Sequence, residues 1–312
     1  MTWAPGLTFS IVTLVAVTKR RVPARTLKSK RRGAAGSKSY VASRPAKERA
    51  AKLAERMPLV HFPASARFDQ WSAWSGQCLK SKVERGETPK PGRFGELRDR
   101  HIFVYAGPCC YYHDGCIGDA VIYFAPGAEE GCKGGATPFD SGSLEDSPAR
   151  LQPFREKKAS EDSRWSFFSK HQVALPDWRE SFADWLAFAY DDPDGYLDSG
   201  PDRHAAGEPE RTRPAYLLSH NGTRGVARYG ADECGDRRSW TWEVRIEATL
   251  PFDKIALLHV PFDAFEHVND FADDVELRTG VRPDVEPLPP GVVASFRSLY
   301  VESGSILRKL VK

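Results

Sequence analysis

Cysteine is scarce in this chain: its 312 residues include only six. That number is too small for a disulfide-stabilised scaffold, and the spacing contains no C-x-x-C pair of the kind that binds zinc. We therefore expect reduced thiols, a cytoplasmic location and no metal site. The chain also lacks a Walker A loop, a G-x-G-x-x-G turn, an H-E-x-x-H helix and a G-x-S-x-G elbow. The nucleotide-binding, zinc-protease and serine-hydrolase classes marked by these motifs thus have no support, and the cofactor is left unknown.

Long apolar runs are missing as well. The run at residues 7–17 is shorter than the roughly 20 residues of a membrane-spanning helix. A signal peptide would carry its positive charges before the run, whereas here Lys19, Arg20 and Arg21 follow it. We expect no transmembrane span. A short membrane anchor and an extension from a mis-assigned start codon remain alternatives for this segment.

Charge is distributed very unevenly along the chain. Residues 1–56 contain 14 Lys and Arg against two Asp and Glu, a net charge of +12, whereas the whole chain has a net charge of only +3. The remaining residues therefore have a net charge of −9. We predict a basic, disordered tail over 1–56 and an acidic α+β globular domain over 57–312. At the end of the tail, residues 46–56 can form a short helix that leads into the domain. The tail would have a weak attraction to nucleic acid or to anionic surfaces, unless it is simply solvated.

Alternation of apolar and polar residues indicates strands along the acidic part of the chain. Residues 239–248 have the clearest pattern, with Trp and aliphatic side chains on one face and Glu243 and Arg245 on the other. Further strands are expected at residues 57–63, 101–106, 119–125, 215–220 and 254–260.

Helical patterns fall within residues 162–190 and 262–278. In the first of these, the aromatic stripe that begins at Trp178 is typical of a core-facing helix. We expect loops at 80–100, at 127–150 and in the proline-rich connector 283–291. Strands and helices do not alternate regularly, so we predict a single α+β domain around a mixed or antiparallel sheet.

The most specific motif is CCYYHDGC at residues 109–116. It resembles, position for position, the histidine box of secreted phospholipase A2. The resemblance implies that His113 is a general base and that Asp114 helps to hold a calcium ion. The chain departs from that family upstream, where residues 96–105 contain no glycine for a calcium loop. It departs again at the box itself, because the strand-like runs on both sides predict a hairpin loop instead of a helix.

Two other segments resemble ADP-ribosyltransferases. GDAVIYFAP (118–126) is similar to the strand beside their nicotinamide pocket, and residues 237–261 are similar to their last pair of strands. The resemblance implies that Glu243 stabilises a developing oxocarbenium charge and that Tyr123 or His101 contacts the cofactor. The alternative for Glu243 is an ordinary ion pair with Arg245 or with a cation on a neighbouring strand.

We expect any active site where GGATPFDSG (134–142) meets the polar face of strand 239–248. The glycines allow close approach to a ligand, and Thr137, Asp140 and Ser141 would face Glu243 and Arg245. The alternative is that Pro138-Phe139 fills the core and the polar groups cap nearby backbone. As a whole, the sequence favours a binding or accessory protein for an unknown small molecule. The ADP-ribosyltransferase and phospholipase hypotheses remain as enzyme alternatives.

Overall fold

The structure is a computed structural model that describes residues 43–65, 67–68, 71, 77–107, 120–139, 141–142, 144, 159–189, 196–197, 242–287 and 306–311. The chain divides into two units, residues 1–39 and 40–312, and every described residue belongs to the second. No helix among the described residues combines the length and apolar character needed to cross a bilayer.

The described residues form five longer helices and ten strands, with short 3-10 turns between them. The helices are α1 (Arg44–Glu55), α3 (Arg93–Arg100), α5 (Glu161–His171), α6 (Trp178–Ala189) and α9 (Phe265–Thr279). The strands are β1 (Leu59–His61), β2 (Cys78–Lys80), β3 (His101–Ala106), β4 (Val121–Phe124), β5 (Gly134–Thr137), β6 (Val173–Ala174), β7 (Trp242–Glu247), β8 (Thr249–Pro251), β9 (Ile255–Val260) and β10 (Asp284–Pro287). The 3-10 turns are η1 (Val83–Arg85), η5 (Leu175–Asp177), η7 (Phe252–Lys254) and η8 (Phe262–Ala264).

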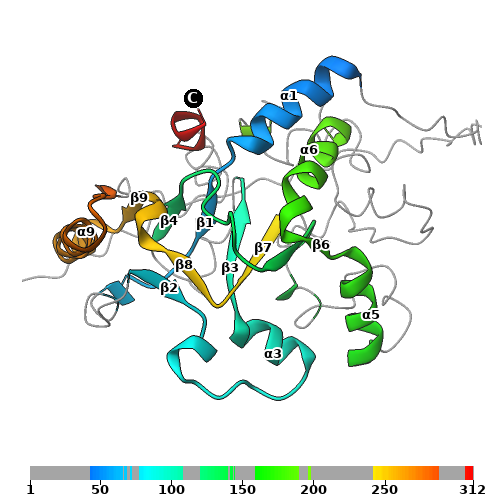
Figure 1. The fold of residues 1–312 in the computed structure, drawn as a ribbon, viewed down its shortest axis with the longest axis horizontal. Coiled ribbons are helices and arrows are strands. Elements are labelled where there is room, and N and C mark those ends of the chain that lie inside the picture. Colours follow the sequence, from blue (N-terminus) through cyan, green and yellow to red (C-terminus); the bar gives the residue numbers. More distant parts are fainter. Residues whose placement is uncertain are drawn as a thin grey trace, which may run out of the picture. The chain divides into compact units, whose positions relative to one another are not determined.

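Eight strands make one sheet in the order β10-β9-β4-β1-β3-β7-β5-β6, and β2 and β8 pair separately. Only the β10–β9 pair in this sheet is parallel, and the other neighbours are antiparallel. Helices α1 and α6 lie side by side, whereas α9 lies at the far end of the sheet beside β9 and β10 (Figure 1). The prediction of an α+β fold around a mixed sheet is therefore confirmed.

Strand β7 has two chemically different faces, as its alternating sequence predicts, and both are buried. Trp242 packs against Phe182 and Trp185 of α6, with ring centroids 5.6 and 6.3 Å apart. Glu243 and Arg245 project from the opposite face and are 0% exposed. Trp178, Phe182, Trp185 and Leu186 are all core residues. The aromatic stripe of α6 is thus part of the core.

Helix α1 belongs to the globular body, so the predicted boundary after residue 56 lies too far along the chain. The helix is capped by Ser43 and buries Ala46, Ala50, Leu53 and Ala54. Its carboxyl end is held by Arg179 of α6, which donates hydrogen bonds to the carbonyls of Ala54, Glu55 and Met57. A cluster of cations in a sequence resembles a solvated tail, but here the small apolar face between the cations packs against α6. The rest of the predicted tail, residues 1–42, lies outside the described residues.

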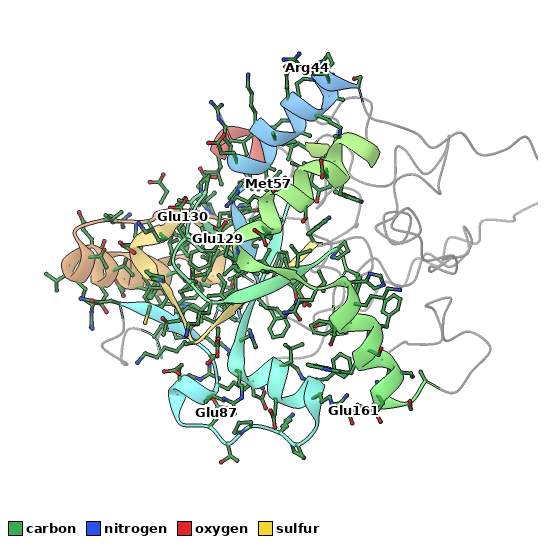
Figure 2. The ribbon with its side chains drawn as sticks, turned by 45° about the vertical axis from the view of Figure 1, so that its right-hand side comes forward. Arg44, Met57, Glu87, Glu129, Glu130 and Glu161 are labelled. Carbon is green, nitrogen blue, oxygen red and sulfur yellow. The ribbon has the colours of Figure 1, made fainter. Side chains whose placement is uncertain are left out.

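Arg179 also connects α6 to the segment that follows β4. Its Nε donates to Glu129 Oε1 at 2.6 Å, and the Trp178 indole donates to the same oxygen at 2.8 Å. Glu129 and Met57 lie in the same part of the molecule in Figure 2. A buried carboxylate with these donors fixes three elements together.

The strands on either side of CCYYHDGC are not the arms of a hairpin. β1 lies between β3 and β4 and is antiparallel to both, so β3 and β4 run parallel to each other. The hairpin prediction was wrong because residue alternation identifies a strand but not its neighbours. His113 and the rest of the motif lie outside the described residues.

Three segments predicted as loops contain regular structure. Residues 80–100 include η1 and α3, GGAT at 134–137 is strand β5, and residues 284–287 are strand β10. Glycine and proline have a low propensity for strands, but β10 is an edge strand of the sheet, where proline is tolerated. The partners of these short strands are distant in sequence and outweigh local propensity.

Candidate functional site

A buried polar cluster, which we call the Glu243 cluster, joins Thr137, Ser141, Glu243 and Arg245. Glu243 accepts hydrogen bonds from Arg245 Nη1 at 2.5 Å, Ser141 N at 2.9 Å and Ser141 Oγ at 3.0 Å. Arg245 Nη1 also donates to Thr137 Oγ1 at 2.8 Å, and that hydroxyl donates to the carbonyl of Phe139. The segment 134–142 therefore does meet the polar face of β7, through Thr137 and Ser141.

Arg245 contacts an aromatic ring as well as its ion-pair partner. Its guanidinium carbon lies 4.6 Å from the ring centroid of Phe168 in α5, a cation–π arrangement. Phe168 belongs to a second apolar cluster that also buries Phe94 and Phe139. Nη2 of Arg245 is buried and has no hydrogen-bond partner among the described residues. The cluster is thus closed to solvent, and its two opposite charges balance each other.

The glycines of β5 explain how Thr137 comes to lie opposite Glu243. Thr137 pairs with Glu243 and Gly134 pairs with Ile246 in the β5–β7 register. A Cβ at Gly134 would lie 1.9 Å from the carbonyl oxygen of Arg245, and Gly134 has φ +145°. Only glycine lets the β5 backbone run this close to β7 at that position. The glycines of this segment thus allow close strand pairing, whereas the sequence pattern predicts a loop that approaches a ligand.

The other predicted site residues are placed in different parts of the structure. Tyr123 is buried in β4, and β1 and β3 separate its strand from β7. Because neighbouring strands are about 4.8 Å apart, Tyr123 and Glu243 are separated by about 14 Å. Tyr123 therefore does not share a contact site with Glu243. Asp140 lies outside the described residues, although the adjoining Ser141 contacts Glu243 directly.

His101 lies in β3 opposite Glu247 of β7. Its Nδ1 is 2.8 Å from the carbonyl oxygen of Leu97. Burial lowers the pKa of His101, and the charge of Arg245 lowers it further, whereas the bond to Leu97 and the carboxylates of Glu247 and Glu243 act in the opposite direction. The imidazole is therefore neutral at pH 7 and lies at the Glu247 end of β7.

An open pocket of about 370 Å³ lies at the Glu247 end of β7, and we call it the β7-end pocket. Its charged lining side chains are Glu84, Arg100, Lys133 and Glu247, and Cys132 adds a thiol. Glu243 and Arg245 do not line it. The volume is within the range of about 300–1,000 Å³ that is usual for small-ligand sites.

The backbone of Ala248 forms part of this pocket in an unusual conformation. Ala248 has φ +69° and is the only described residue besides glycine with a positive φ. Its N–H donates to the carbonyl of Arg100 at 3.3 Å, and its carbonyl accepts from Ser81 N at 2.8 Å. A left-handed alanine is strained by about 1–2 kcal/mol, so the surrounding hydrogen bonds must hold it in place.

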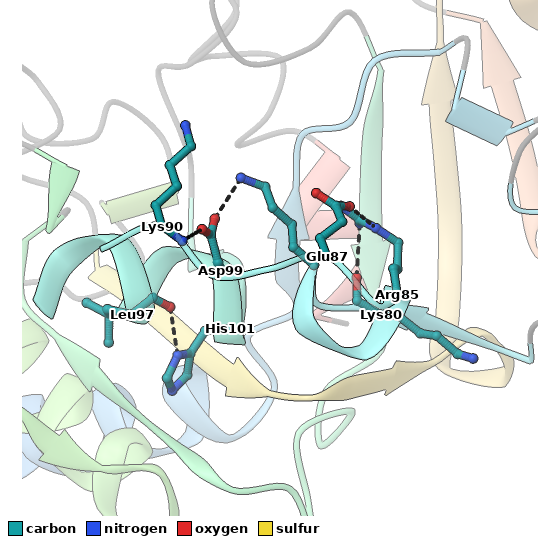
Figure 3. Close-up of polar contacts among 8 residues, drawn as sticks. Lys80, Arg85, Glu87, Lys90, Leu97, Asp99 and His101 are labelled. Atoms are coloured by element: carbon teal, nitrogen blue, oxygen red, sulfur yellow. Dashed lines mark hydrogen bonds and ion pairs between the residues drawn. The ribbon is translucent and has the colours of Figure 1, made fainter. Parts of the chain in front are cut away.

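Asp99 precedes the pocket-lining Arg100 in α3 and contacts the segments before that helix (Figure 3). This buried carboxylate accepts hydrogen bonds from Lys82 Nζ and from Lys90 N, both at 2.8 Å. Burial by itself would raise the pKa of Asp99, but these hydrogen bonds and the nearby lysine charges lower it. The ionised Asp99 therefore ties η1 to the end of α3 and sets the positions of Glu84 and Arg100.

No protein-family model matches the chain, and comparison with curated proteins gives no match. Among the described residues, no three His, Cys, Asp or Glu side chains come close enough together to hold a metal ion. The two described cysteines, Cys78 and Cys132, are free thiols.

Sequence reasoning found the Glu243 cluster but missed the β7-end pocket. The pocket combines residues 81–84, Arg100, residues 131–133 and residues 247–249, which have no common motif. One local feature lies at the pocket: the strand is interrupted at Ala248, between the end of β7 at Glu247 and the start of β8 at Thr249.

Proposed function

We propose that this chain is a binding protein for a small polar molecule and that the molecule occupies the β7-end pocket. The observation that carries the proposal is the state of the pocket's four charged side chains. Glu84, Arg100, Lys133 and Glu247 line one pocket, and none of them has an ion pair or side-chain hydrogen bond with another described residue. Charged groups that converge on a concave surface without partners are available to a ligand.

The Glu243 cluster supports this proposal by its contrasting state. The Glu243 carboxylate already accepts three hydrogen bonds and is 0% exposed. A carboxylate so fully engaged has little capacity left for a substrate. In our proposal the cluster is a structural anchor that attaches β5 to β7, and the ligand binds at the other end of the same strands.

The free thiols of Cys78 and Cys132 support the expected cytoplasmic location, because the cytoplasm keeps thiols reduced. The predicted attraction of the basic segment to nucleic acid or anionic surfaces concerns mainly residues 1–42, which lie outside the described part. The resemblances to ADP-ribosyltransferases and to phospholipase A2 remain predictions without a supporting contact in the described residues.

The proposal can be tested by thiol alkylation, with Cys132 as the probe of the pocket and Cys78 as the control. Cys132 lines the pocket and Cys78 does not, and burial raises the pKa of both thiols. A library of small polar compounds is screened by thermal unfolding of the full chain, and each stabilising compound is tested for protection against thiol alkylation. A compound at 100 times its Kd should stabilise the protein by about 2.7 kcal/mol.

Peptide mapping then gives the alkylation rate of each cysteine separately. We expect a stabilising compound to slow alkylation of Cys132 and to leave Cys78 unchanged. Equal protection of both thiols, or stabilisation without protection of Cys132, would place the ligand elsewhere and contradict the proposal. The variant Val83→Trp, which fills part of the pocket, should abolish the protection.

A further inference from the structure

We infer that the ligand of the β7-end pocket is a zwitterion of the size of a free amino acid or dipeptide. This inference rests on the proposed function and specifies its ligand class. The four charged lining residues are two cations, Arg100 and Lys133, and two anions, Glu84 and Glu247. A ligand with one carboxylate and one ammonium group is the simplest molecule that complements both signs.

Backbone hydrogen bonds bring these four residues together around Glu247 and Ala248. Glu247 N donates to the carbonyl of Lys133 at 2.8 Å, and Ala248 N donates to the carbonyl of Arg100 at 3.3 Å. Ser81 N donates to the carbonyl of Ala248, and the Ser81 hydroxyl accepts from Glu84 N at 3.4 Å. Cations and anions are therefore held on neighbouring segments, although no pair among them comes within ion-pair distance of 4.0 Å.

The separation of these charges matters because opposite charges elsewhere in the same region do form ion pairs. Lys82 lies 2.8 Å from the buried carboxylate of Asp99, and Arg85 lies 2.6 Å from Glu87 (Figure 3). The four charged pocket-lining residues come from four different segments, namely η1, the end of α3, the position before β5 and the end of β7. A zwitterion between them would gain charge-assisted hydrogen bonds at both of its ends.

The same charges disfavour two other ligand classes. A phosphorylated polyanion would meet the carboxylates of Glu84 and Glu247, and the formal charges of the four side chains sum to zero. A divalent cation would need several oxygen ligands in one place, and among the described residues no three acidic, His or Cys side chains converge. A neutral polyol would leave the charged groups without charged partners.

The inference is tested by isothermal titration calorimetry of the full chain with each standard L-amino acid and with glycylglycine. Every compound that binds is measured again as its N-acetyl derivative, which lacks the ammonium, and as its amide, which lacks the carboxylate. We expect each derivative to bind about tenfold more weakly or worse than the parent zwitterion.

Substitutions in the pocket assign the two ends of the ligand. Arg100→Ala and Lys133→Ala should weaken binding of the zwitterion about tenfold and leave binding of the amide unchanged. Glu247→Gln should weaken the zwitterion and leave the N-acetyl derivative unchanged. Lys47→Ala and Glu266→Gln, two exposed positions outside the pocket, are the matched controls and should change nothing.

The outcomes separate this inference from the function on which it rests. If only sugars, phosphates or single-charge derivatives bind and also protect Cys132 from alkylation, the zwitterion inference is wrong and the binding function stands. If no compound of any class protects Cys132, the proposed function fails as well. Binding of an amino acid that none of the pocket substitutions affects would also overturn the inference, because the ligand would then occupy another site.

Discussion

The charged side chains at the two ends of the paired strands β5 and β7 differ in burial and in pairing. At one end, Glu243 and Arg245 are fully buried and paired with each other at 2.5 Å, and Arg245 lies against the ring of Phe168. At the other end, Glu247 is exposed and lines a pocket with three further charged side chains, and none of the four has an ion pair or side-chain hydrogen bond with another described residue. The comparison teaches that charges along one strand face can be buried and paired at one end and exposed in a pocket at the other, and in our proposal only the exposed charges bind a ligand.

The largest difference between the two ends should appear when one charge is removed. Glu243→Ala leaves Arg245 buried without its counter-charge, and we expect a loss of about 3–5 kcal/mol in the free energy of unfolding. Glu247→Ala removes an exposed carboxylate and should change stability by less than about 0.5 kcal/mol. Urea denaturation of both variants measures the contrast. Similar losses for the two variants would show that the ends do not differ in this way.

A double variant tests whether the buried pair as such is required. Glu243→Leu combined with Arg245→Met replaces both charges with apolar side chains, so no uncompensated charge remains. It should be more stable than Glu243→Ala alone, because removing both partners avoids the desolvation cost of a single buried charge.

The next largest effect concerns two glycines near the Glu247 end of β7, one packed against the strand and the other lining the pocket. Gly134→Ala would place a methyl group against the carbonyl oxygen of Arg245, so we expect a loss of about 3 kcal/mol. Gly131 lines the pocket with φ +78° and has open space around its Cα. Gly131→Ala therefore has only the conformational cost of about 1–2 kcal/mol. Equal losses would mean that close packing at Gly134 contributes nothing.

His101 allows the comparison to be examined by pH, because it lies opposite Glu247 and the charges of Glu243, Arg245 and Glu247 all act on its pKa. Its pKa in the folded protein is below the value of about 6.5 expected for the unfolded chain. The unfolded chain therefore binds a proton more readily, and the stability contribution, fully present above pH 6.5, is lost as the pH falls toward the folded pKa. The slope from one group cannot exceed about 1.4 kcal/mol per pH unit.

The measurement is urea denaturation at several pH values, with His101→Gln expected to reduce the slope below pH 6.5. Burial lowers the pKa of His61 to about 4, so His61 titrates over an overlapping range. The comparison is therefore made in a His61→Gln background. An unchanged slope would show that protonation of His101 has no effect on stability.

The smallest effect is expected from relief of strain in the pocket. Ala248→Gly removes the cost of the left-handed conformation but adds the entropic cost of glycine, so the two nearly cancel. We expect stability to increase by less than about 1 kcal/mol. Ala136→Gly in the middle of β5, where the backbone is ordinary strand, should be destabilising instead. A clear loss of stability in Ala248→Gly would show that Ala248 is not strained.

Local sequence pattern was sufficient for several elements of the fold. The alternation around Glu243 and Arg245 identified β7 and the chemical difference between its faces, and the stripe from Trp178 identified the buried side of α6. These features depend on residues within one element, whose periodicity records which side is buried. For the same reason the contact of segment 134–142 with β7 could be anticipated from complementary polar residues.

Only the tertiary structure decided which strands became neighbours and where the pocket formed. The insertion of β1 between β3 and β4, the strand conformation of residues 134–137 and the attachment of α1 through Arg179 all depend on contacts between residues far apart in the chain. The β7-end pocket depends on them most, because its four charged side chains come from separate segments joined by backbone hydrogen bonds at Ala248. Periodicity determines which face of an element is buried, whereas the free energy of packing over the whole chain determines what that face meets.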